Sequence, residues 1–540
     1  MKQIVTIMLF SILCIGSAYA GAITAPVNPE FTKWQESLKD NSSDKSTSDF
    51  GSEEEAPTHP PLTRRPSPLD ESHLYNESIV PEGASQMFPS KFAVPVPPET
   101  AYDLRTLNRD SGVRNQSPYG TCWAFAALAS AESTARVNGG GPFDFSEKHL
   151  AYYGYVDQNA SLVGFDRQAQ AAPDSVYDLG GNDPAAIAVL SRQSGIINEA
   201  VEPYVNMGPS EGDDTLPAGT APAPFPTKAF DLKHALFAPA GDHVVDNMKY
   251  LLKTYGALSI GVGYRNENYD ATNKSFYQTA YASSNHGVTV VGWNDNFPKE
   301  NFNTHMGSPL VPQNNGAWIV KNSWGSSWGD QGYFYVSYES RCIVEEGAYA
   351  YVAEKPVRDS YRYSYTPLGR VSYIGIGGYS DEWMANRYIA ENNLPLQEVS
   401  FYTATPDTTA TIYIYTNPTA ASPRTGTLAL TTSAKVLPVS GFHTIKLDSP
   451  VELEKNQSFS IVVQLESTSV ASATLVSVEK PINGYSSKAT ASTGQSYFSG
   501  DGINWTDVAG VWANNNVCLD AITYSGTVDL TPIRMLLLSD

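Results

Sequence analysis

Residues 116–132 read QSPYGTCWAFAALASAE, and this stretch decides how the rest of the chain is interpreted. A turn-forming run precedes Cys122, and an alanine-rich segment of strong helix formers follows it, up to the stop signal NGGG at 138–141. Cys122 is therefore predicted in the first turn of a helix, where free backbone N–H groups and the helix dipole favour an anion. Such a position lowers the pKa of a thiol and suits a nucleophile; the alternative is a small, buried apolar cysteine.

Two polar residues further along the chain can complete a catalytic group with Cys122. A thiolate nucleophile needs a proton carrier, and the carrier needs a residue that orients it. His286 begins HGVTVVGW, in which a glycine and then an alternating apolar strand follow the histidine. Asn322 lies between the apolar strand AWIVK and a Trp-Gly turn, where its amide can accept the imidazole N–H and fix the tautomer, with Trp324 covering the bond against water.

The first 20 residues have the pattern of a signal peptide. Lys2 supplies the positive charge, residues 4–16 form the apolar stretch, and Ala18-Tyr19-Ala20 is a small-x-small cleavage site. We expect a soluble exported protein, secreted or held at the cell surface or in the periplasm. No later segment has the roughly 18 uninterrupted apolar residues of a membrane helix.

The composition indicates a folded, multidomain protein that does not bind nucleic acid. The 540 residues are 41% hydrophobic and carry 56 acidic against 35 basic side chains, a formal net charge of -21. Such a chain lacks the basic surface that attracts nucleic acid or anionic membranes. Once Cys14 leaves with the signal peptide, only Cys122, Cys342 and Cys518 remain, so the fold does not depend on a disulfide scaffold.

Composition also divides the mature chain into three regions. Residues 21–98 are rich in Ser, Asp, Glu and Pro and cannot fold alone, so we expect a propeptide or a spacer with one short helix in PEFTKWQESL. Residues 99–355 combine helical patterns with strands and hold every candidate catalytic residue. Residues 360–525 contain short Thr-, Val-, Tyr- and Ile-rich runs between turn clusters, which predicts an all-β sandwich.

The segments around the three candidate residues together resemble the active-site blocks of the papain-like cysteine peptidases. QSPYGTCWAF, NHGVTVVGW and KNSWGSSWGDQGYF follow one another in the family's order. The resemblance implies an α+β fold of two lobes, one helical and one like a β-barrel, and hydrolysis of peptide bonds through a thioester on Cys122. It further implies that His286 is the base and then the acid, and that Asn322 orients it. Gln116 would help the Cys122 N–H to hold the oxyanion.

The resemblance also implies residues that bind the substrate, and no cofactor for catalysis. Gly180 and Gly181 are similar to the glycine pair that offers backbone hydrogen bonds to an extended substrate. GALSIGV is similar to the strand beside the S2 pocket, which makes Ala257 a wall of that pocket. Trp324 and Trp328 match tryptophans near the primed subsites, with core packing as the alternative for Trp328.

Other features depart from the family. Tyr119-Gly120-Thr121-Cys122 replaces the usual Cys-Gly-Ser-Cys, so the family's loop disulfide is absent, and Cys342 and Cys518 either pair with each other or are two independent buried thiols. The long helical propeptide of plant and lysosomal members is missing. FTKWQESL is our candidate for the part of an inhibitory segment that lies in the cleft, and Thr63-Arg64-Arg65 is our candidate for an exposed cleavage site.

The third region resembles the lectin-like domain that follows the peptidase in some bacterial surface cysteine proteases, clostridial ones among them. The resemblance rests on the order of IGGYSDEWMANRYIAENNLPLQEVSFYTATPDTTATIYIYT, GFHTIKLDSPVELEKNQSFSIVVQL and SYFSGDGINWTDV. It implies a calcium site, for which Asp381, Glu382 and Asp501 are the candidates. It also implies surface carbohydrate as a partner.

Two functions remain open from the sequence. One is an exported endopeptidase that acts on protein or peptide substrates. The other is a carbohydrate- or surface-binding protein with a degenerate peptidase scaffold. Degenerate copies commonly lose the nucleophile, and because Cys122, His286, Asn322 and Gln116 are all present, the sequence favours the peptidase. An acyltransferase with the same residues would differ only in whether water or another amine resolves the acyl-enzyme.

Overall fold

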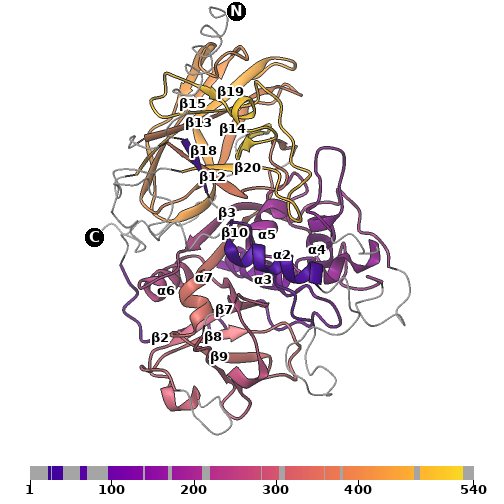
Figure 1. Cartoon of the computed structure of the whole chain (residues 1–540), viewed down its shortest axis with the longest axis vertical. Coiled ribbons are helices and arrows are strands. Elements are labelled where there is room, and N and C mark those ends of the chain that lie inside the picture. Colours follow the sequence, from indigo (N-terminus) through magenta and orange to yellow (C-terminus); the bar gives the residue numbers. More distant parts are fainter. Residues whose placement is uncertain are drawn as a thin grey trace, which may run out of the picture.

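The computed structural model describes residues 22–25, 27–40, 61–69, 95–137, 140–167, 173–208, 219–280, 283–302, 311–357, 359–376, 381–467 and 475–526. The predicted signal peptide lies outside these residues. The described residues form a helical lobe, a β lobe and a β-sandwich, each around its own hydrophobic core (Figure 1). Among them, no helix has the length and apolar character needed to cross a membrane.

The helical lobe is built on a central helix that begins at Cys122. It comprises α3 (Cys122–Val137), α4 (Glu147–Tyr155), η3 (Pro173–Asp178) and α5 (Asp183–Leu190). Residues 122–135 of α3 are all buried, because their small alanine and serine side chains let other elements pack closely on every side. The side chains of Ser146 and Asn182 cap the first turns of α4 and α5.

The β lobe packs against the other side of α3. Its strands are β2 (Ala101–Asp103), β3 (Asp231–Ala238), β4 (Leu258–Val262), β5 (Tyr269–Asp270), β6 (Ser275–Phe276), β7 (His286–Asn294), β8 (Ala317–Lys321), β9 (Tyr333–Ser337) and β10 (Ala348–Glu354). Its helices are α6 (Val244–Thr254), η4 (Asn266–Asn268), η5 (Lys299–Phe302) and α7 (Arg341–Glu346). Strands β4, β7 and β10 all contact α3, so the two lobes meet along this helix.

The sandwich follows in the chain and is almost entirely β. Its elements are β11 (Tyr361–Tyr363), β12 (Ser372–Ile376), β13 (Asp381–Ile389), β14 (Leu396–Thr403), β15 (Thr408–Thr416), β16 (Thr427–Thr431), β17 (Lys435–Leu437), β18 (Ser440–Val451), β19 (Ser458–Ser467), β20 (Val476–Glu479), β21 (Ser496–Ser499), β22 (Thr506–Asp507), α8 (Val508–Val511), β23 (Asn516–Val517) and β24 (Leu519–Thr523). The predicted fold class, an α+β two-lobed unit followed by an all-β sandwich, is confirmed.

One sheet runs from the β lobe into the sandwich. Its strand order is β11-β24-β14-β18-β3-β10-β4-β7-β8-β9-β6-β5, with β2 beside β7. At the junction β3 pairs antiparallel with β18, and His234 lies opposite His443. A buried ion pair of 2.5 Å between Lys233 and Glu398 crosses the same junction. The sandwich is therefore fixed to the β lobe by main-chain hydrogen bonds as well as by the connecting residues.

The described N-terminal residues pack on the other parts of the chain. β1 (Ala22–Thr24) adds a strand to β12 of the sandwich. α2 (Pro29–Asp40) contains FTKWQESL, so the predicted helix is confirmed. Phe31 is fully buried against Tyr485 of the sandwich, with 5.8 Å between the ring centroids. This region has no core of its own and is ordered by the surfaces that it covers.

None of the three cysteines among the described residues forms a disulfide, and all three are buried. Cys342 accepts a hydrogen bond from the Gly263 N–H at 2.9 Å and donates one to Gln278. Of the two alternatives left by the sequence, Cys342 and Cys518 are independent thiols and not a disulfide.

Candidate active site

The loop before α3 and the loop before α5 meet beside Cys122. The Gly120 N–H donates to Asp178 at 2.8 Å, which ties the two loops together. A Cβ on Gly181 would lie 2.3 Å from the ring of Trp123, so only glycine allows this loop to approach the start of α3. The structure thus brings Gly180 and Gly181 next to the predicted nucleophile.

His286 and Asn322 form a buried hydrogen-bonded pair. The Nε2 atom of His286 lies 2.8 Å from Oδ1 of Asn322, and because an amide oxygen only accepts, the imidazole proton is on Nε2. Nδ1 is therefore the basic nitrogen. Trp324 stacks on the imidazole, with 4.7 Å between the centroids and 29° between the rings, and covers the pair.

His286 lies beside Cys122 because β7 begins against the first turn of α3. A Cβ on Gly287 would lie 3.1 Å from the Cys122 carbonyl oxygen, which is a tight contact that glycine avoids. The backbone N–H of Gly287 also lies against the thiol. The glycine next to the predicted base thus lets β7 start close against the first turn of α3.

Gln116 is fully buried and its side-chain amide is held in place on both sides. Its Oε1 accepts from the Ser323 hydroxyl at 2.7 Å, and its Nε2 donates to the Tyr119 carbonyl at 2.8 Å. The same nitrogen reaches the carbonyl oxygen of Pro61 at 3.4 Å. An amide donor therefore points at a carbonyl group of the chain's own N-terminal region.

Residues 61–69 occupy this site as an extended strand. The Arg64 N–H donates to the Asn285 carbonyl at 2.9 Å, and Arg64 pairs with Gly181 in a parallel bridge. On either side of Arg64, the Thr63 carbonyl accepts from the Gly181 N–H at 3.2 Å and the Arg65 N–H donates to the Gly181 carbonyl at 3.0 Å. The glycine loop already binds a peptide backbone, and that peptide belongs to the same chain.

This arrangement reverses two expectations from the sequence. FTKWQESL does not lie at the nucleophile: Trp34 of α2 lies against the Arg65 guanidinium, and Asn28, just before α2, binds the carbonyl groups of Ser67 and Pro68. Arg64 and Arg65 are not exposed either. The side chain of Arg64 is 10% exposed, and Arg65 as a whole residue is 4% exposed. Arginine is buried here because carboxylates and aromatic rings replace its water, and a local sequence pattern does not report such partners.

Burial raises the pKa of the Cys122 thiol, although the N–H groups of Gly287 and Thr63 and the charge of Arg64 work in the opposite direction. The helix dipole alone predicted a lowered pKa. The difference arises because Cys122 is fully buried, and burial disfavours the charged thiolate.

The other predicted substrate-binding residues lie in two places. Trp328 stacks on Tyr269 at 4.9 Å and meets Trp324 edge-on at 5.0 Å, so it supports the ring that covers His286. Ala257 lies elsewhere: its N–H and carbonyl bind Ser133 and Ser130 in the middle of α3. The structure therefore gives Ala257 no place beside Cys122.

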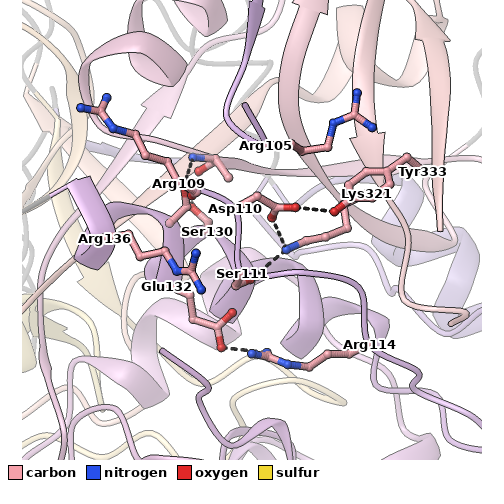
Figure 2. Close-up of polar contacts among 12 residues, drawn as sticks. Arg105, Arg109, Asp110, Ser111, Arg114, Ser130, Glu132, Arg136, Lys321 and Tyr333 are labelled. Atoms are coloured by element: carbon pink, nitrogen blue, oxygen red, sulfur yellow. Dashed lines mark hydrogen bonds and ion pairs between the residues drawn. The ribbon is translucent and has the colours of Figure 1, made fainter. Parts of the chain in front are cut away.

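A buried ionic network, which the sequence did not reveal, connects the strand before Asn322 to α3 (Figure 2). Lys321 contacts Asp110 at 2.6 Å and Ser111 at 2.8 Å, and the Tyr333 hydroxyl donates to Asp110. A few residues further on, Arg114 pairs with Glu132 of α3 at 2.7 Å. The only signal in the sequence was a lysine that ends an apolar strand, AWIVK. The network fixes the position of Asn322 relative to α3, the helix that begins at Cys122.

The acidic candidates in the sandwich do not form a cluster. Both carboxylate oxygens of Asp501 accept hydrogen bonds from its own turn, including the N–H groups of Ile503 and Asn504. Asp381 accepts from Gln464 on the neighbouring strand. In the part of the chain that the structure describes, no three Asp, Glu, His or Cys side chains gather to hold a metal ion. Calcium binding stays a prediction.

The two-lobed fold with a cysteine at the start of α3 and a histidine–asparagine pair against it defines a class of cysteine peptidase. Residues 98–352 match the model of the papain family cysteine protease, and residues 362–523 match the model of the lectin like domain. The chain thus contains a papain-family cysteine peptidase domain followed by a lectin-like domain.

Individual relatives agree with this assignment. A viral cathepsin of Antheraea pernyi nuclear polyhedrosis virus is 26% identical over 243 residues, which is 44% of this chain and 58% of the relative. Cysteine proteinase 1 of Dictyostelium discoideum is 27% identical over 244 residues, 44% of this chain and 60% of the relative. The chain therefore spans less than two thirds of the length of these two relatives.

Solved structures extend the likeness to both domains. The cysteine protease and lectin-like domains of Cwp84, a surface layer associated protein of Clostridium difficile, give a TM-score of 0.70 at 22% identity, covering 94% of this chain and 99% of that one. Cwp84 after propeptide cleavage gives 0.67 at 24% identity, covering 79% and 100%. At these identities the likeness shows a shared fold.

Proposed function

We propose that this protein is an exported endopeptidase in which Cys122, His286 and Asn322 hydrolyse peptide bonds through a thioester. The observation that carries the proposal is the 2.8 Å bond between His286 and Asn322 beneath Trp324, at the helix start that holds Cys122. A base with a fixed tautomer beside a thiol is what nucleophilic catalysis by cysteine needs.

The residues have distinct roles in the proposed reaction. His286 takes the thiol proton at Nδ1, and the thiolate attacks the carbonyl carbon of the substrate. The oxyanion is stabilised by the Gln116 amide and the Cys122 N–H. His286 then gives the proton to the leaving amine. Water hydrolyses the thioester in the second half of the reaction, with His286 again acting first as base and then as acid. Asn322 accepts from Nε2–H throughout and keeps the ring in position.

We further propose that the 61–69 segment keeps the enzyme inactive until it is removed. The segment uses the backbone groups of Gly181 and Asn285 and reaches the Gln116 amide, all of which a substrate would need. The Thr63 N–H of the segment also lies against the Cys122 thiol. An exported peptidase that is latent until cleaved is consistent with these contacts.

The direct test is cleavage of an unfolded protein substrate by the chain without residues 1–20, before and after limited proteolysis has removed the segment. We expect cleavage only after removal, none with Cys122→Ala, and normal cleavage with Cys518→Ala, which removes a buried thiol of the sandwich. Cleavage that survives Cys122→Ala would refute the proposed nucleophile. Mass analysis of the products separates hydrolysis from transfer to an added amine.

The lectin-like domain is proposed to bind a surface ligand, with carbohydrate as the class to test first. Its sheet is continuous with that of the β lobe, so any surface it binds is held at a fixed orientation to the active site. Retention on a carbohydrate array of wild-type protein, and its loss when sugar competitors are added, would support this role.

A further inference from the structure

Two partly exposed aromatic rings lie together on the sheet that contains β13, β15 and β19. Trp383 of β13 and Tyr413 of β15 belong to a small cluster of their own, whereas Met384 and Ile412, their neighbours in the strands, fill the main core of the sandwich. Because successive side chains of a strand point to opposite faces, the two rings stand on the face opposite to that core, which we call the outer face. Their centroids are 5.5 Å apart, with 28° between the planes, and solvent reaches both rings.

The rings are held in place on the outer face. Ala385 and Val462, which belong to the same cluster, are fully buried, so the surface beneath the rings is closed. Gly502, in the turn between β21 and β22, packs on the indole of Trp383, and a Cβ there would lie 2.6 Å from the ring. A ligand that binds here would therefore cost the indole little conformational freedom.

Other apolar side chains extend this surface. Ile503, next to Gly502 in the same turn, is 78% exposed, and Leu428 of β16, opposite Tyr415 in the strand register, is 50% exposed. The partly exposed Trp505 donates from its indole N–H to the Gly502 carbonyl at 3.2 Å. A single exposed apolar side chain needs no explanation, but a group of them around two aromatic rings indicates a binding surface.

Polar side chains lie beside the rings on the outer face. Gln464 of β19 lies directly opposite Trp383 in the strand register. Its amide oxygen accepts from the Tyr413 hydroxyl at 3.1 Å, and its amide nitrogen donates to Asp381 at 3.1 Å and to Glu466 at 2.8 Å. These contacts fix the amide and both carboxylates, and because all three side chains are only partly buried, a ligand on the rings can reach them.

Arg424 adds donors to these acceptors. Its guanidinium carbon lies 5.5 Å from the ring centroid of Trp383 and 5.8 Å from that of Tyr413. It donates to the Tyr415 hydroxyl at 2.9 Å and to the Gly502 carbonyl at 2.5 Å, which holds it against the rings. Fixed donors and fixed acceptors therefore both lie next to the aromatic surface.

This combination fits a carbohydrate better than a protein or a membrane. A pyranose has a flat C–H face that packs on aromatic rings, and its hydroxyls both donate and accept hydrogen bonds. A protein interface usually has an apolar centre with its polar groups at the rim, whereas here an amide and two carboxylates lie directly beside the rings. The carboxylates also repel an anionic membrane.

We propose that the outer face of β13, β15 and β19 binds a neutral carbohydrate, with a pyranose packed on Trp383 and Tyr413 and its hydroxyls bound by Gln464 and Arg424. The proposal rests on the proposed carbohydrate-binding role of the lectin-like domain and gives that role a location. Asp381 and Glu466 disfavour an acidic sugar. These strands lie in the upper part of the sandwich in Figure 1, away from the two lobes of the peptidase, so a bound sugar leaves the active site accessible.

The test uses the chain without residues 1–20 and an array of immobilised neutral oligosaccharides, and the sugar that retains most wild-type protein is then titrated. Trp383→Ala and Tyr413→Ala should each raise Kd about tenfold or more, because each removes a ring that packs on the sugar. Gln464→Leu keeps the side-chain volume, removes the amide and should raise Kd about fivefold. Tyr361→Ala is the matched control, since this 39% exposed tyrosine of the sandwich belongs to another sheet and should leave Kd unchanged.

The outcomes separate the site from the binding role. The melting temperature of each variant checks that the sandwich is folded, and if Trp383→Ala does not fold, Tyr413→Ala and Gln464→Leu decide. Unchanged Kd values in the folded variants, or an equal loss in Tyr361→Ala, overturn the site and leave the carbohydrate-binding role standing. Retention of the wild type on no sugar of the array overturns that role, and this site with it.

Discussion

Replacement of Arg64 by methionine should release the 61–69 segment and expose Cys122. Methionine keeps most of the side-chain length and removes the charge. The closed form would then bury Asp183 and Glu346 without the guanidinium that now lies 2.9 Å and 3.8 Å from their oxygens. In the open form both carboxylates regain water, so the substitution destabilises the closed form specifically.

The size of the effect follows from the burial of the pair. Removal of one partner of a buried ion pair costs about 3–5 kcal/mol. The Arg64 side chain is 10% exposed and the contact with Glu346 is long, so we take about 2 kcal/mol as the lower estimate. At about 1.4 kcal/mol per factor of ten, the open fraction rises at least about 30-fold.

The assay is the rate at which a small alkylating reagent modifies Cys122 in the uncleaved chain, followed by peptide mass spectrometry. Lys33→Met is the matched control: Lys33 lies in the same N-terminal region, and its pair with Glu30 has a lysine side chain that is 70% exposed. Its rate should equal that of the wild type. An Arg64→Met rate within about twofold of the wild type would refute the view that this ion pair holds the segment in the site.

Three further changes test the supporting structure. Asn322→Ala should lower kcat/KM on the order of 10²-fold without abolishing it, because the base loses its orientation and the nucleophile remains; an unchanged rate would contradict the role of Asn322. Lys321→Met should lower the free energy of unfolding by about 3 kcal/mol in denaturant titrations, since Asp110 stays buried without its cation; a loss below about 1 kcal/mol would contradict a structural network. Burial raises the pKa of Glu147 from 4.5, its value in an unfolded chain, to about 8 in the folded protein. The protonated side chain therefore contributes fully to stability below pH 4.5, and this contribution is lost as the pH rises toward 8. Melting temperatures should therefore fall over this range, and less so in Glu147→Gln; parallel curves would contradict the assignment.

The sequence predicted well what is local. Cys122 at a helix start, His286 at a strand start and Asn322 after a strand all follow from short patterns, and the structure brings them together. The helix in FTKWQESL was also predicted, because its periodicity is contained in one segment. Such features depend on neighbours within a few residues.

The sequence could not predict contacts between distant segments. A dibasic pair is exposed in most proteins, and Arg64 is buried only because Asp183 and Glu346 come from two different lobes. Arg65 likewise lies over the rings of Trp34, Tyr155 and Tyr485, at 5.7, 4.8 and 5.3 Å. No local pattern links these residues, so the segment that fills the site was assigned to the wrong part of the N-terminal region.

Covalent labelling is the most direct test of the central claim that Cys122 is an activated nucleophile covered by residues 61–69. The chain without residues 1–20, before and after proteolytic removal of the segment, would be incubated with an epoxide inhibitor of papain-family peptidases and the adduct mapped by mass spectrometry. We predict one adduct on Cys122 in the cleaved protein, little in the uncleaved protein, and none on Cys342 or Cys518. An unlabelled Cys122 in both forms would contradict the account.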